Sequence, residues 1–142
     1  MKPWLFPLLL VLAACSPGGT PDGSLALDKL RGQWVVINYW AIWCKPCAQE
    51  IPELNALDKL PGVTVLGVNF DAATGEELAG QLEKLDIRFP TLDADPAAQL
   101  GVPRPVVLPT SLVIDPSGNL HETLVGPQTL QSLAAATAQE LE

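Results

Sequence analysis

The feature that most constrains the fold is a pair of cysteines at the point where a strand-like segment gives way to a helix-like one. Residues 33–40 (QWVVINYW) are rich in β-branched and aromatic side chains, as is typical of a strand covered on both faces. Cys44 and Cys47 follow, with two residues between them, and residues 46–59 then show helical spacing of their leucines. The sequence therefore predicts a strand–dithiol–helix unit.

The rest of the chain alternates between strand-like and helix-like segments. It contains no internal repeat and no sign of a second domain. We expect a single α/β domain over residues 25–142, built on one central sheet with helices on both faces. The predicted strands are residues 63–70, 89–92, 110–114 and 120–125, with a short edge strand at 25–27, and the predicted helical segments are residues 74–85, 96–100 and 127–141.

The position of the cysteines favours redox chemistry. A helix start supplies unpaired N–H groups and partial positive charge, which stabilise a thiolate at Cys44, and Lys45 adds a nearby positive charge. We expect Cys44 to be the exposed nucleophile and Cys47 to be more shielded and to resolve a mixed disulfide. A structural disulfide and half of a metal site are the alternatives. Because Ala48 follows the pair, and because a second C-x-x-C or a C-x-x-H is missing, we expect neither haem, zinc nor any other cofactor.

Composition narrows the possible partners. Eight Lys and Arg against sixteen Asp and Glu give a formal net charge of −8, and no basic cluster exists that could bind a phosphate backbone. Nucleic acid is therefore excluded as an expected partner. With 48% hydrophobic residues, the chain has enough apolar side chains for a packed core.

The N-terminus has the pattern of an export signal. Residues 1–14 contain one lysine and an apolar stretch too short to span a bilayer, as in a signal peptide. The stretch ends in Leu-Ala-Ala-Cys15, which resembles the lipobox of bacterial lipoproteins. The resemblance implies a lipidated Cys15, a flexible tether over residues 15–24, and attachment to the periplasmic side of a bacterial membrane. By the same analogy, Ser16 favours the outer over the inner membrane.

Residues 40–54 (WAIWCKPCAQEIPEL) resemble the active-site segment of the thioredoxin superfamily, and more narrowly of the TlpA/ResA-like extracytoplasmic thiol–disulfide oxidoreductases. Residues 65–71 and 108–118 extend the resemblance. It implies a thioredoxin-like fold with a mixed sheet and an enzyme that reduces disulfides in oxidised envelope proteins, in some relatives during cytochrome c maturation. It also implies a membrane thiol protein as electron donor. A monomer is the default expectation.

The resemblance also assigns roles to residues outside the dithiol. Pro109 occupies the position of the superfamily's cis-proline, which would present the Leu108 backbone to a partner's extended chain. Glu50 matches an acidic position that would serve Cys47 as acid and base. Asn38 stands where cytoplasmic thioredoxins carry a buried aspartate, and an amide cannot titrate.

Further residues are expected to line the site. Trp43, Lys45 and Pro46 would form its surface beside the cysteines. Residues 103–108 depart from the family because this approach to the cis-proline is longer and richer in proline, and Arg104 within it is either a contact for an acidic partner or a solvated charge.

Two other functions compete with the reductase. One is a thioredoxin-fold lipoprotein that acts as a binding or chaperone module, with a permanently oxidised pair. The other is peroxide reduction, which the C-x-x-C pair disfavours because the reactive cysteine of peroxiredoxins normally lacks such a partner.

Overall fold

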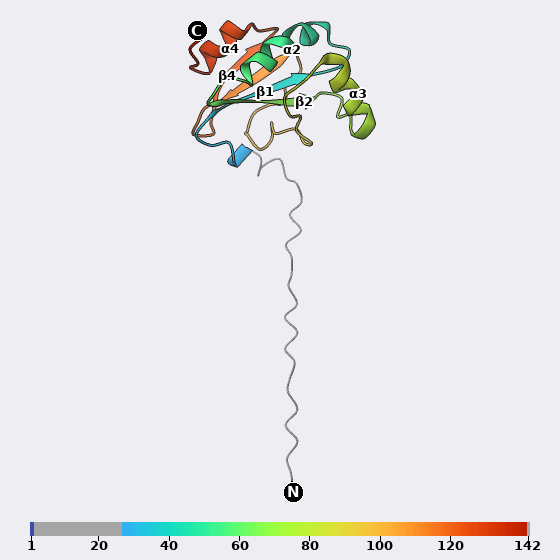
Figure 1. The fold of residues 1–142 in the computed structure, drawn as a ribbon, viewed down its shortest axis with the longest axis vertical. Coiled ribbons are helices and arrows are strands. Elements are labelled where there is room, and N and C mark those ends of the chain that lie inside the picture. The colour runs from blue at the N-terminus through green and yellow to red at the C-terminus, as the bar shows by residue number, and fades with distance from the viewer. Residues whose placement is uncertain (2–26, 142) are drawn as a thin grey trace.

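The protein is described by a computed structural model that covers Met1 and residues 27–141 (Figure 1). Apart from Met1, the predicted signal peptide (1–14) lies outside the described residues, as do the lipidation site Cys15 and the tether (15–24). The elements are β1 (Trp34–Trp40), α2 (Lys45–Leu57), β2 (Val63–Asn69), α3 (Gly75–Leu85), β3 (Thr110–Ile114), β4 (Leu120–Val125) and α4 (Leu130–Ala136).

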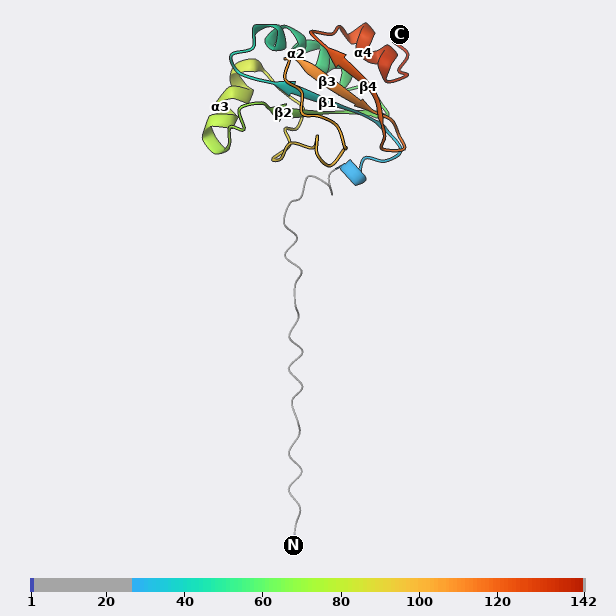
Figure 2. The ribbon, with the colours of Figure 1, turned by 180° about the vertical axis from the view of Figure 1, so that it is seen from behind.

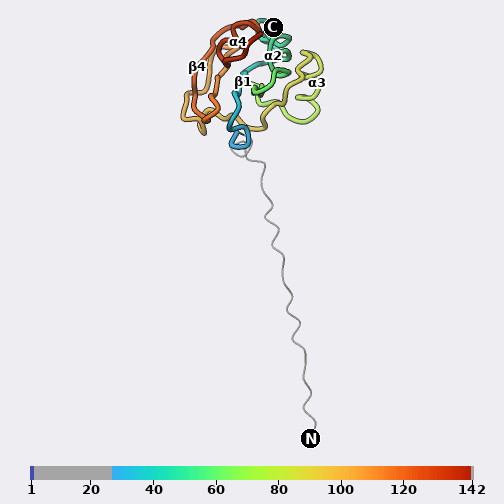
Figure 3. The backbone as a smooth tube through the Cα atoms, turned by 60° about the vertical axis from the view of Figure 1, so that its left-hand side comes forward, coloured from blue at the N-terminus to red at the C-terminus, as the bar shows by residue number. Residues whose placement is uncertain are grey.

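The four strands form one mixed sheet in the order β2-β1-β3-β4. β1 pairs in parallel with β2 and antiparallel with β3, and β3 pairs antiparallel with β4. β1 is a central strand whose two faces both pack in apolar clusters, so six of its seven residues are buried. This is why the segment reads as almost continuously apolar. β4 and α3 lie at opposite edges of the domain (Figure 3).

Two helices cover one face of the sheet. α2 and α4 lie side by side there (Figures 1 and 2), and their buried leucines pack with valines from β1, β2 and β3. The apolar side chains of α3 join a separate cluster around Trp40 at the end of β1. Packing of this kind explains why the apolar side chains of α2 and α3 recur every three or four residues.

The opposite face of the sheet is covered differently from the prediction. Within the described residues, its cover consists of short turns and of the long loop between α3 and β3, rather than a long helix. Val35, Ile37 and Leu112 on this face pack against a set of partly buried side chains from these segments: Leu27, Leu30, Leu92, Leu100, Val102 and Leu108.

Three predicted elements differ in extent. Leu27 belongs to a helical turn instead of an edge strand, and the strand predicted at 89–92 is reduced to a single bridge between Gly67 and Thr91. The last helix is shorter than predicted. It begins after a capping box formed by Thr129 and Ser132, and it ends before Ala138, whose φ of 51° leaves the right-handed helical region.

No helix in the described part of the chain is long and apolar enough to cross a membrane.

The close packing around Gly67 generates a stability prediction. A Cβ at this position would lie 2.9 Å from Nε1 of the fully buried Trp40 and 3.1 Å from Oγ1 of Thr91. We expect Gly67→Ala to lower the free energy of unfolding by about 1–3 kcal/mol, because overpacking forces rigid neighbours apart. Urea denaturation of the full chain measures this.

Gly80→Ala is the matched control, since Gly80 lies in α3, where an added Cβ would meet nothing within 4 Å. There alanine favours the helix by about 0.5–1 kcal/mol. Equal effects of the two substitutions would contradict the packing argument.

Candidate active site

The dithiol lies at the junction of β1 and α2. Cys44 is the N-cap of α2, and its Sγ accepts a hydrogen bond from the backbone N–H of Cys47 at 3.2 Å. The two cysteines form a disulfide with their Cα atoms 5.3 Å apart. The helix start therefore places an N–H donor at the sulfur of Cys44, as the sequence predicts, and favours its thiolate after reduction.

The predicted exposure of Cys44 is wrong for this disulfide form. Cys44 is 4% exposed and Cys47 is 1% exposed. Both side chains pack in a cluster with Trp40 and Ala41, and Leu108 covers part of it. The disulfide therefore lies within an apolar cluster at the start of α2.

The residues beside the pair form an exposed rim. Trp43 is 63% exposed, and Lys45 and Pro46 are exposed as well. The indole Nε1 of Trp43 donates to Oδ2 of Asp71 at 2.8 Å, and its ring meets Phe70 edge to face at 6.3 Å. These contacts fix the orientation of a large apolar surface next to the dithiol.

The peptide bond between Leu108 and Pro109 is cis. Pro109 is buried, and its carbonyl accepts a hydrogen bond from the Gly126 N–H at 2.9 Å. Leu108 packs against the cysteine cluster. The structure therefore brings Leu108 and the dithiol together, whereas presentation of the Leu108 backbone to a partner stays a prediction.

Glu50 is the buried carboxyl group of the site. It lies one helical turn after Cys47 in α2 and is 1% exposed. Its Oε1 accepts from the backbone N–H of Gln128 at 3.1 Å, and its Oε2 accepts from Nδ2 of Asn38 at 3.0 Å. Asn38 is itself fully buried in β1 and donates a second bond to Oγ of Ser111 at 3.0 Å.

Burial raises the pKa of Glu50 to about 7, against the smaller opposing effects of the N–H groups of Gln128 and Asn38. A carboxyl group with this pKa can both hold and release a proton near neutral pH. It lies on the same helix as Cys47, which makes it a candidate acid and base for that thiol.

Arg104 has partners within the protein, although its side chain stays 45% exposed. Its Nε donates to Oδ2 of Asp95 at 2.8 Å, a second guanidinium nitrogen donates to the Phe70 carbonyl at 2.7 Å, and the guanidinium lies 4.0 Å from the centre of the Phe70 ring. Tyr39 donates to the other oxygen of Asp95 at 2.6 Å. Arg104 thus ties the proline-rich loop to the residue that supports Trp43.

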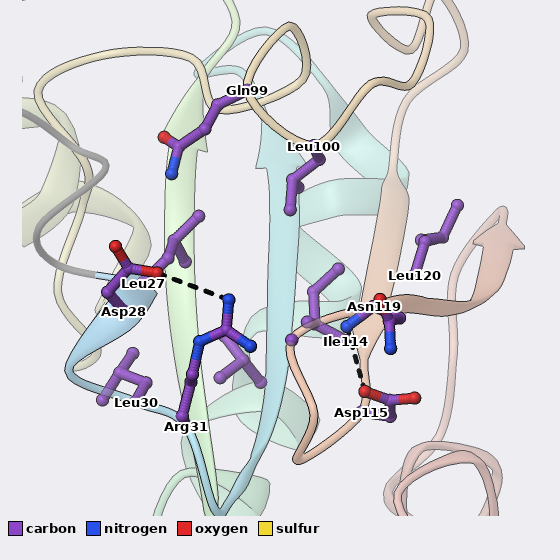
Figure 4. A pocket seen from close by; sticks show the side chains of 12 residues that line it. Leu27, Asp28, Leu30, Arg31, Gln99, Leu100, Ile114, Asp115, Asn119 and Leu120 are labelled. Atoms are coloured by element: carbon purple, nitrogen blue, oxygen red, sulfur yellow. Dashed lines mark hydrogen bonds and ion pairs between the residues drawn. The ribbon is translucent and has the colours of Figure 1, made fainter.

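A separate hollow of about 210 Å³ lies elsewhere in the domain (Figure 4). It is lined by residues at the N-terminal end of β1, around the turn that joins β3 to β4, and near Leu27. Arg31 and Asp28 form an ion pair at 3.6 Å beside it. Because the dithiol follows the other end of β1, this hollow is distinct from the candidate active site.

Three further residues that shape the site, Ser111, Gln128 and Asp71, are not predicted from the sequence. Gln128 acts through its backbone and Asp71 lies in a loop, so neither has a recognisable pattern. Ser111 did carry a signal, since it is a small polar residue in a strand of otherwise mostly apolar residues directly after the cis-proline.

Comparison with known proteins gives a consistent result. The model of the AhpC/TSA family matches residues 15–123. The thiol-disulfide oxidoreductase ResA of Bacillus cereus is 32% identical over 113 residues, covering 78% of this chain and 65% of ResA. The thiol:disulfide interchange protein HelX of Rhodobacter capsulatus is 33% identical, covering 72% of this chain and 57% of HelX. The chain thus spans about two thirds or less of the length of these relatives.

A solved structure confirms the thioredoxin-like fold class. The thiol:disulfide interchange protein of the thioredoxin family from Chlorobium tepidum superimposes with a TM-score of 0.60 and 26% identity, over 78% of this chain and 81% of that one.

The raised pKa of Glu50 predicts a pH-dependent stability. The folded protein binds this proton more tightly than the unfolded chain does. The resulting stabilisation is therefore complete below pH 4.5 and is lost as the pH rises to about 7. We expect Glu50→Gln to remove this loss, so that the free energy of unfolding of the variant gains about 3 kcal/mol relative to the unmutated protein between pH 4.5 and pH 8. Denaturant unfolding of the oxidised chain at a series of pH values measures the difference.

Glu53→Gln is the control, because Glu53 lies on the same helix but is not among its buried residues. A constant difference between the Glu50→Gln variant and the unmutated protein across this range would contradict a raised pKa.

Proposed function

The chain belongs to the AhpC/TSA family, and on this basis we propose that it is a thiol–disulfide oxidoreductase that acts on protein disulfides through Cys44 and Cys47. The observation that carries the proposal is the disulfide at the start of α2, with the carboxyl group of Glu50 buried one turn further along the helix. The relatives ResA and HelX, both named for thiol–disulfide exchange, support the same chemistry.

In the reducing direction, the Cys44 thiolate attacks one sulfur of a client disulfide. A mixed disulfide forms, and the first client sulfur leaves as a thiolate. Cys47 then loses its proton to the Glu50 carboxylate and attacks the sulfur of Cys44. The second client sulfur leaves as a thiolate, so the client gains two electrons and the protein is left with the Cys44–Cys47 disulfide.

Trp43 and the cis-proline strand would receive the client. The rim formed by Trp43, Lys45 and Pro46 is exposed, and Leu108 packs against the cysteine cluster. An extended client segment between them would place its disulfide over Cys44. The buried state of Cys44 implies that reduction of the pair or client binding exposes its sulfur.

We further propose that the protein works outside the cytoplasm, on oxidised envelope proteins, with apocytochrome c as one candidate client. The apolar segment 1–14 and the lipobox-like sequence before Cys15 support a lipid anchor on the periplasmic side, with the outer membrane favoured. A membrane thiol protein would return electrons to Cys44 and Cys47, and the protein would act as a monomer.

Trapping with oxidised glutathione tests the exchange chemistry. In the full chain carrying Cys15→Ser, reduced Cys44 and Cys47 should release glutathione and close their disulfide. A further Cys47→Ser substitution should stop the reaction at a glutathione adduct on Cys44, which mass spectrometry detects. Cys44→Ser should slow the reaction by more than about tenfold, because the remaining thiol lacks the helix N-cap position.

A pair that resists reduction by excess dithiothreitol, with no adduct in either variant, would refute the enzyme. It would leave the alternative of a binding or chaperone module with a permanent disulfide.

The reduction potential tests the direction. For the same Cys15→Ser chain in dithiothreitol redox buffers, we expect a value nearer to the roughly −270 mV of thioredoxin than to the roughly −120 mV of a strong oxidant. A value at the oxidising end would contradict the reductase and favour disulfide formation or isomerisation.

A further inference from the structure

Asn38 is the link between Glu50 and the strand that carries the cis-proline. Its side chain is fully buried, and both hydrogens of its amide nitrogen are used, one toward Glu50 and one toward Ser111, each at 3.0 Å. Ser111 is 1% exposed and is the cross-strand partner of Asn38 in the pairing of β1 with β3. The three side chains therefore connect α2, β1 and β3.

The orientation of the Asn38 amide determines whether the Glu50 carboxylate faces a hydrogen-bond donor or an acceptor. With the nitrogen toward Glu50, an N–H donor stabilises the carboxylate. With the oxygen toward it, the carboxylate would face a second acceptor. The Asn38 Oδ1 is buried without a hydrogen-bond partner among the described residues, so the two N–H bonds alone hold this orientation.

The two hydrogen bonds of the Asn38 amide nitrogen respond differently to the charge of Glu50. The bond to Glu50 weakens when that carboxyl group is protonated, because hydrogen bonds to charged groups are stronger than hydrogen bonds to neutral ones. The bond to the Ser111 hydroxyl does not depend on the charge of Glu50. Losing it would leave a buried N–H without an acceptor and would remove one of the two bonds that hold the amide in this orientation.

We propose that Ser111 is a positioning residue for the thiol–disulfide reaction: its hydroxyl keeps the amide nitrogen of Asn38 directed at Glu50, so that β3 helps to set when Glu50 holds its proton. The proposal rests on the function proposed above and adds to it a residue outside the dithiol helix, two positions after Pro109.

The other groups around Glu50 do not provide this control. The loop before α4 contributes the backbone N–H of Gln128, which cannot rotate. On α2 itself the neighbouring titratable groups are Cys47 and Glu53, and Glu53 accepts instead from the backbone N–H of Leu130 at 2.7 Å. β1 and β3 contribute the uncharged Asn38 and Ser111.

Ser111→Val and Ser111→Thr form a matched pair for the test. Both add a branched side chain to the same strand position, and only threonine keeps a hydroxyl. In the oxidised full chain, the titration of the Glu50 carboxyl carbon is followed by NMR. We expect the valine variant to raise its midpoint by about one pH unit, which corresponds to the loss of one hydrogen bond to the amide, while threonine leaves it unchanged.

The pH dependence of the glutathione reaction should shift in the same direction as the titration midpoint of Glu50. In the reduced Cys15→Ser chain, the pH at which glutathione release is half-maximal should move upward in the valine variant and stay in place in the threonine variant. A residue needed only for packing would lower stability without separating the two pH profiles. Equal midpoints in the two variants would overturn the proposal.

Two further measurements keep the outcome decisive. If the valine variant fails to fold, the unmutated protein provides the test. It should show an NOE between an Asn38 Hδ2 proton and the Ser111 Hβ protons at pH values below and above the Glu50 titration midpoint. Loss of that NOE at either pH would overturn the proposal. If Glu50→Gln leaves the pH profile unchanged, the acid and base role of Glu50 fails. If that profile responds to Glu50→Gln and not to the Ser111 pair, the positioning role alone fails.

Discussion

A polar side chain with no access to water must find its hydrogen bonds within the protein, and Asn38 imposes this requirement on the centre of the sheet. Its amide meets a carboxyl group from α2 and a hydroxyl group from β3. Glu50 in turn needs the backbone of Gln128 before α4. The relative positions of α2, β1, β3 and the loop before α4 are therefore fixed by polar contacts as well as by apolar packing, directly behind the dithiol.

The front of the site is held by a second set of contacts. Trp43 is anchored by Asp71 and Phe70, and Phe70 is held in turn by Arg104 from the loop that leads to the cis-proline. This loop is longer and richer in proline than in the family that the sequence resembles. In the folded protein, its arginine is used to connect the two walls of the site.

Local patterns in the sequence were sufficient for the strand–dithiol–helix unit. β1 and α2 lie within one or two residues of their predicted ends, because burial on both faces and a proline at the helix start leave clear signals. The family resemblance supplied the cis bond before Pro109 and the position of Glu50. Contacts between distant segments could not be read in this way. The partners of Asn38 come from residues 12 and 73 positions away, the acceptor for Arg104 depends on a loop conformation, and the burial of Cys44 follows from tertiary packing of the disulfide.

The cross-strand pair of Asn38 and Ser111 has a consequence for the order in which the site forms. Cys44 and Cys47 are three positions apart and can meet in an unfolded chain, whereas closing β1 against β3 requires a loop of more than seventy residues, which is among the slower steps of folding. A chain that has not yet folded therefore carries two ordinary thiols that can oxidise without control. The environment that tunes them exists only once the last of the inner strands is in place, so completion of the fold is itself the step that turns a reactive pair of cysteines into a regulated one.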